Sequence, residues 1–148
     1  MRFIRLILAR RAFICGIFAA GLLLESVPAM AADPFPFDQE LLLDAAPMRP
    51  GKRMPILTVA PDGKAAIDLW CKSVTAQVEL SDAGIKIDPG PLRDALPEMM
   101  GNGQCTPERM QADQDLLAVI SQVTSWRSQG GALVLEGPTK LKFRPASN

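Results

Sequence analysis

The chain has 148 residues, with 16 basic and 16 acidic side chains, three cysteines and no histidine. This length allows one small domain with a single core. The absence of histidine excludes a serine–histidine hydrolase, and isolated cysteines without histidine make a poor metal site.

Residues 1–31 predict a secretory signal peptide that is removed after Ala31. Four arginines precede an apolar run over residues 12–24, and Ala29-Met30-Ala31 forms a small-residue cleavage site. The run is too short to span a bilayer comfortably, although a retained N-terminal anchor is the alternative interpretation. We therefore expect export to a bacterial periplasm or the medium, with no membrane span after cleavage.

The composition of the mature chain differs from that of the precursor. The signal removes four arginines and Glu25, which leaves 12 basic and 15 acidic residues, a net charge of −3 on 117 residues. This charge argues against nucleic acid or an anionic membrane surface as the main partner. Two cysteines in an exported domain favour one disulfide between Cys71 and Cys105, with metal or catalytic use as the weaker alternative. We expect no cofactor, no metal and a monomer.

The first half of the mature chain predicts strands after a flexible lead-in over residues 32–38. Alternation is cleanest over residues 74–80, and Pro61-Asp62-Gly63 and residues 81–84 predict turns. In the third strand, Asp68 and Trp70 face away from the apolar side. The expected strands cover residues 39–44, 55–60, 65–71, 74–80 and 85–88, of which the first could instead be a helical turn.

An amphipathic helix is predicted after the second cysteine. Thr106 suits the N-cap, Pro107 the first helical position and Glu108 the first turn. We expect Asp113 and Asp115 on the solvated face of this helix. The expected apolar face consists of Met110, Leu116, Leu117, Ile120 and Val123. The preceding residues 88–103 are the least regular, with a helical turn or two expected over residues 92–100.

Three further strands are expected over residues 126–129, 132–136 and 140–144, followed by a tail at residues 145–148. The last strand places Lys140, Lys142 and Arg144 on one face, which predicts an edge strand protected from pairing. The short turns favour antiparallel pairing. The fold class is therefore α+β, mainly β, in a single domain over residues 39–144.

The order of several motifs resembles a known family. A strand ending in cysteine, IDLWC at residues 67–71, precedes the strands VTAQVEL and IKI. A second cysteine then opens QCTPERMQADQDLLAVI, and L-x-L and L-x-F follow at Leu133–Leu135 and Leu141–Phe143. Over roughly residues 39–143 the chain resembles the META domain, or HslJ-like, proteins of bacterial envelopes. The resemblance implies a small curved antiparallel sheet, roll- or barrel-like, with one amphipathic helix packed against it.

The same resemblance implies a function in general terms only. HslJ-like proteins are associated with heat-shock response and antibiotic tolerance, which implies an exported, non-catalytic domain. Such a domain would support envelope integrity or stress tolerance by binding another envelope component. Similarity to lipid-binding secretin pilotins gives the alternative of a carrier that holds a lipid or other apolar ligand within the sheet. A carboxylate-based hydrolase that uses Asp68 is a remote alternative.

No catalytic residue carries over from the family, so the candidate sites are contact residues. The two tryptophans could stack a ligand, and the methionines could line a pliable apolar groove. The commoner roles are core packing for tryptophan, loop anchoring for methionine and solvent exposure for an aspartate. The candidates for contact with an envelope protein or an apolar ligand are Asp68, Trp70, Met99, Met100 and Trp126.

Overall fold

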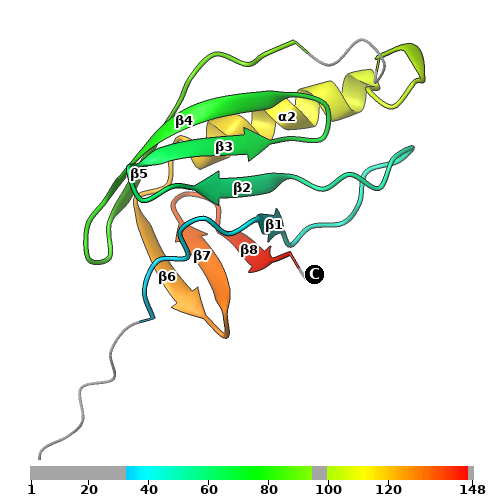
Figure 1. Cartoon of the computed structure of the whole chain (residues 1–148). Helices are drawn as coiled ribbons and strands as arrows, with labels where there is room; N and C mark the ends of the chain where they lie inside the picture. The colour runs from blue at the N-terminus through cyan, green and yellow to red at the C-terminus, as the bar shows by residue number, and fades with distance from the viewer. Residues whose placement is uncertain (1–32, 95–99, 147–148) are drawn as a thin grey trace, which may run out of the picture. The chain divides into compact units, whose positions relative to one another are not determined.

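A computed structural model of the chain describes residues 33–94 and 100–146, and the predicted signal peptide and Met99 lie outside them. Within these residues, eight strands and the helix α2 form the domain (Figure 1). The strands of the first half are β1 (Leu41–Leu43), β2 (Ile56–Val59), β3 (Lys64–Asp68), β4 (Ser73–Leu80) and β5 (Ile85–Pro89). The second half contains α2 (Pro107–Ile120), β6 (Ser125–Gln129), β7 (Ala132–Glu136) and β8 (Leu141–Pro145).

The strands form one antiparallel sheet that curves until its ends meet. Their order is β5-β4-β3-β2-β1-β8-β7-β6, so β1 joins two meanders by pairing with both β2 and β8. The end strands touch at a bridge between Gly84 and Ser125. There Ile85 N donates to Thr124 O at 3.1 Å and Trp126 N donates to Ala83 O at 2.9 Å. The sheet is therefore nearly closed and barrel-like, which confirms the expected mainly-β fold with one helix.

The core fills the concave side of the sheet. Alternation places one side chain in two toward this side, and Leu116 and Ile120 of α2 join them. The innermost side chains, each at most 2% exposed, are Leu41, Leu57, Val59, Ile67, Leu69, Val74, Ile87, Leu133, Leu135 and Phe143, with Ile120 from the helix. Among the described residues no helix is both long and apolar enough to traverse a lipid bilayer.

The expected edge position of the last strand is wrong, because β8 lies inside the sheet between β1 and β7. Lys142 of β8 and Lys140, which directly precedes the strand, make ion pairs on the solvent face instead. Lys142 Nζ lies 3.7 Å from Asp44 Oδ2, and Lys140 Nζ lies 3.6 Å from Glu136 Oε1. An interior antiparallel strand with one solvated face shows the same alternation as an edge strand. The ends of the sheet are β5 and β6, and β5 ends at Pro89, which cannot donate to a neighbour.

Two segments depart from the expected local structure. The third strand ends at Asp68 rather than Cys71, because the chain turns there and Leu69 N donates to Lys72 O at 2.8 Å. The lead-in, expected to be flexible, packs the Phe35 ring into the core. Hydrogen bonds in the lead-in join Phe37 N to Phe35 O at 2.9 Å and Asp38 N to Val59 O at 2.8 Å.

Candidate functional site

The first turns of α2 carry two fully buried charged side chains. The Thr106 side chain caps the helix by accepting a bond from Arg109 N at 3.4 Å, and Pro107 starts it as expected. Arg109 and Asp113, four residues apart, are both 0% exposed. They continue the buried stripe of the helix formed by Leu116 and Ile120. The expectation that Asp113 lies on the solvated face is therefore wrong.

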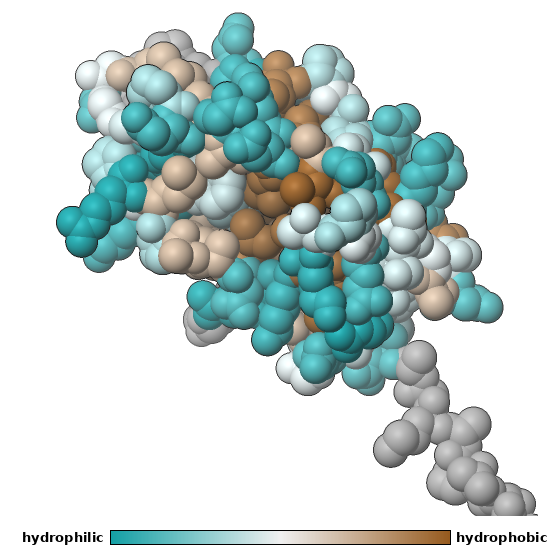
Figure 2. All heavy atoms as spheres, turned by 180° about the vertical axis from the view of Figure 1, so that it is seen from behind, coloured by the Kyte–Doolittle hydropathy of each residue, from teal (hydrophilic) through white to brown (hydrophobic). Residues whose placement is uncertain are grey.

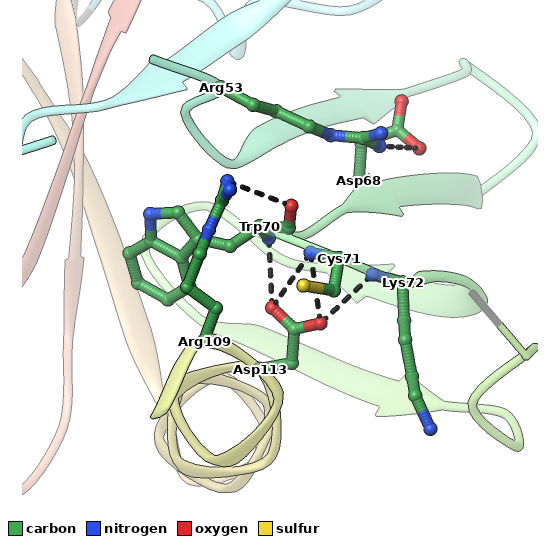
Figure 3. Close-up of polar contacts among 7 residues, drawn as sticks. All are labelled: Arg53, Asp68, Trp70, Cys71, Lys72, Arg109 and Asp113. Carbon is green, nitrogen blue, oxygen red and sulfur yellow. Dashed lines mark hydrogen bonds and ion pairs between the residues drawn. The ribbon is translucent and has the colours of Figure 1, made fainter. Parts of the chain in front are cut away.

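The Asp113 carboxylate binds the turn that follows β3 (Figure 3). Oδ1 accepts from Trp70 N at 2.8 Å, and Oδ2 accepts from Lys72 N at 2.9 Å. Cys71 N approaches both oxygens, at 3.3 and 3.1 Å. Three successive backbone N–H groups thus converge on one carboxylate, in the way that backbone nests bind anions. These bonds compensate for the burial of the charge and hold the chain out of the extended strand that the sequence predicts there.

The Arg109 guanidinium binds one carbonyl group of the same turn and one carbonyl group of the segment before α2. Nη2 donates to Trp70 O at 3.0 Å, and Nη1 donates to Gln104 O at 2.6 Å. The backbone at Gly51 closes over it, since a Cβ there would stand 2.8 Å from Nη1. Arg109 and Asp113, which we call the buried clamp, therefore hold the C=O and the N–H of Trp70 and fasten α2 to the β3–β4 turn.

The clamp places opposite charges in a dry environment. Burial raises the pKa of the Asp113 carboxyl, while the backbone N–H groups of residues 70–72 and the charge of Arg109 act in the opposite direction. Within the described residues, Arg109 Nε and the buried Trp70 Nε1 have no hydrogen-bond partner. The remaining polar groups of the clamp are engaged by the backbone, which suits a fastening role.

Two cysteines, Cys71 and Cys105, lie beside the clamp. Cys71 and Cys105 are buried together with Met110 against them, and both thiols are free in this structure. Burial raises the pKa of the Cys71 thiol to about 12, with further contributions from a hydrogen bond with Cys105 and the charge of Asp113. A protonated, buried thiol is a poor nucleophile. The disulfide that the sequence predicts between Cys71 and Cys105 is not formed in this structure.

The predicted contact residues do not form one site in the structure. Asp68 is 48% exposed and pairs with Arg53, whose Nη2 lies 3.4 Å from Asp68 Oδ1 (Figure 3). Trp70 is buried at the clamp. Trp126 is partly buried where β5 and β6 meet, and its Nε1 donates a hydrogen bond to Ser81 O at 3.3 Å. Met100 is exposed. Of these residues, only Trp70 contributes to the clamp.

Sequence reasoning missed both members of the clamp. Arg109 has no predicted role, and Asp113 is predicted with Asp115 on the solvated face of the helix. The spacing contained the signal, since residues 109, 113, 116 and 120 follow intervals of four, three and four, as one helical face requires. Counting that interval without regard to residue type would have placed both side chains on the buried face.

Comparisons with known proteins agree with this fold. The model of the META domain family matches residues 39–147. No curated protein matches the chain. Among solved structures, the NMR structure of a protein from Burkholderia xenovorans is similar, with a TM-score of 0.54 and 18% sequence identity. The similarity covers 84% of this chain and 97% of that chain, and at this identity it shows a shared fold alone.

Proposed function

Because the chain belongs to the META domain family, we propose that it is an exported, non-catalytic domain that supports envelope integrity or stress tolerance by binding another envelope component. The family itself has no settled activity, so the proposal is supported by the residues of this chain. The predicted signal peptide supports export to an oxidising compartment. There, the thiols of Cys71 and Cys105, which are free in this structure, would form the predicted disulfide.

The observation that carries the non-catalytic assignment is the buried clamp. Catalytic carboxylates need access to substrate. Asp113 is 0% exposed, and its carboxylate accepts hydrogen bonds from three backbone N–H groups. Its partner Arg109 donates to two backbone carbonyls. The two buried charged side chains of the described residues therefore hold the helix on the sheet, which favours a rigid scaffold.

The surface of the domain supports a binding role. Figure 2 shows hydrophobic residues gathered across the middle of the face opposite the view of Figure 1, with hydrophilic residues around them. A hollow of about 400 Å³ lies between the end of β5 and α2, and Pro89, Leu92 and Leu117 contribute apolar surface to it. Apolar surface bordered by polar residues is typical of interaction sites.

The first experiment is mass spectrometry of the protein exported by its own signal. In the denatured state we expect the mass of a chain that begins at Ala32 and lacks two hydrogens because of the disulfide. In the native state we expect no bound small molecule. A stoichiometric adduct that disappears on denaturation would contradict the binding-module proposal and favour the apolar carrier. A mass that retains residues 1–31 would contradict signal cleavage.

A second prediction concerns the proposed absence of a carboxylate-based hydrolase. Asp68→Asn is expected to leave stress tolerance unchanged and to lower the free energy of unfolding by about 0–1 kcal/mol, because an exposed ion pair contributes little. Stress-survival assays and urea denaturation check both results. Arg53→Gln is the matched control, since it removes the other partner of the ion pair. Loss of stress tolerance in a stable Asp68→Asn protein, but not in Arg53→Gln, would revive the hydrolase hypothesis.

A further inference from the structure

The lead-in, residues 33–38, occupies a surface beside the end strand β6 (Figure 1). Its Phe35 side chain is 7% exposed, and the ring meets Trp126 of β6 edge-on, with centroids 5.0 Å apart at 83°. The Phe37 ring lies 4.9 Å from that of Phe35. Ser128 Oγ adds a hydrogen bond of 3.2 Å to Asp33 Oδ2. The segment is thus held by an aromatic anchor with a polar contact near its start.

The covering segment lies outside the matched domain, and the covered surface lies within it. The match to the META domain family begins at residue 39, whereas Trp126 and the strands around it lie within the match. The domain therefore presents the Trp126 ring, which is covered by residues outside the matched range. Aromatic side chains at the surface provide much of the contact energy of peptide-binding sites.

The covered surface continues into open space next to the lead-in. A hollow of about 430 Å³ is bordered by Pro34, Phe35 and Pro36 on one side and by the domain on the other. The domain contributes Ser128 of β6, Gly131 of the hairpin, Ala132 and Leu133 of β7 and Pro145 of β8. The hollow is wide enough for additional side chains of an extended segment, because ligand pockets begin at a few hundred Å³.

We propose that this surface is a docking site for an extended peptide segment of another envelope protein in which a phenylalanine stands between prolines. The lead-in, with Phe35 between Pro34 and Pro36, is its built-in occupant. Prolines keep such a segment extended and lower the entropy lost on binding, and the phenylalanine fills the place against Trp126. This inference rests on the proposed function, since it names the surface and the chemistry of the partner.

The tethered occupant sets the conditions for binding. A segment joined to its site by a short linker acts at an effective concentration on the order of millimolar. A partner must displace it, so the intact chain binds such a peptide weakly. Removing the Phe35 ring vacates the position against Trp126 without shortening the chain.

The test uses the mature chain and a synthetic peptide of residues 33–38, DPFPFD. The peptide is titrated into wild-type protein and into Phe35→Ala, and the indole N–H resonances of the two tryptophans are followed by NMR. We expect Phe35→Ala to bind the peptide at least tenfold more tightly, with the Trp126 resonance shifting and the Trp70 resonance unchanged. Phe37→Ala is the matched control, because it removes a neighbouring ring but leaves Phe35 in place.

A peptide with alanine in place of its first phenylalanine should not bind. Equal binding of DPFPFD to wild type and Phe35→Ala, or none to either, would overturn the proposal. Should Phe35→Ala fail to fold, Phe35→Leu keeps apolar volume, and a failure of this variant to bind more tightly than wild type counts equally against the site. The proposed function is tested separately by the exported protein, so a failed titration removes this site without deciding the general binding role.

Discussion

Asp113→Ala is expected to lower the free energy of unfolding by about 3–5 kcal/mol, among the largest effects of any single substitution in this chain. The substitution leaves the N–H groups of residues 70–72 without their acceptor and Arg109 without its counter-charge in a site closed to water. Each loss is costly because the groups that remain stay buried. Urea denaturation of the two proteins measures the difference.

Matched variants separate this effect from the loss of any helical aspartate. Asp115 lies two residues away and is exposed. Among the described residues, the one hydrogen bond to its side chain comes from Gln111 Nε2, at 2.9 Å. Asp115→Ala should therefore change the free energy of unfolding by less than about 0.5 kcal/mol. Asp113→Asn keeps one oxygen but loses the charge opposite Arg109, so an intermediate loss is expected. A change below about 1 kcal/mol in Asp113→Ala would show that the clamp contributes little to stability.

Formate offers a further test, because a small carboxylate could enter the place vacated by the Asp113 side chain. We expect formate to raise the urea midpoint of Asp113→Ala more than that of Asp115→Ala, since a ligand of the native state stabilises it by mass action. Equal responses of the two variants would indicate a general salt effect and argue against an anion-binding turn.

The clamp also shows why part of the molecule could be predicted from sequence and part could not. Strands with one buried face repeat every two residues, so β4 and β7 were found nearly to the residue. The predicted solvated position holds for Asp115, which is exposed, but not for Asp113, which is buried. Burial of a carboxylate depends on donors more than forty residues away in the chain, and no local pattern reports them.

Local sequence likewise does not predict where a strand lies within a sheet. The alternation of β8 correctly placed Leu141 and Phe143 in the core, yet it could not tell whether another strand lies on each side. That outcome depends on β1, a strand of three residues that joins the two halves of the sheet. The lead-in was misjudged for a related reason, because its prolines suggested looseness while Phe35 finds a partner ring in β6.

In the exported protein we expect a Cys71–Cys105 disulfide whose reduction lowers the free energy of unfolding by about 3.5–4 kcal/mol, the chain-entropy estimate for a loop of this length. Cys71 belongs to the turn held by Asp113, and Cys105 directly precedes the N-cap Thr106. The bond would therefore fasten the same joint as the clamp. Urea denaturation with and without reductant measures the loss. The double variant Cys71→Ala, Cys105→Ala should show no response to reductant.

The reduced protein gives an independent check of the same pair. Burial raises the pKa of the Cys71 thiol from 9.0 to about 12, so the folded state keeps a proton that the unfolded chain has already released. Between these values the unfolded state binds fewer protons, and the free energy of unfolding of the reduced protein must fall as the pH rises from 9 to 12. The oxidised protein has no thiol at this position and lacks that contribution. At pH 8, alkylation of the folded, reduced protein should be roughly a hundredfold slower than in urea, because the thiolate is scarce and shielded. Rapid alkylation of the folded protein would show instead that the thiols are accessible and would reopen a reactive role for the cysteines.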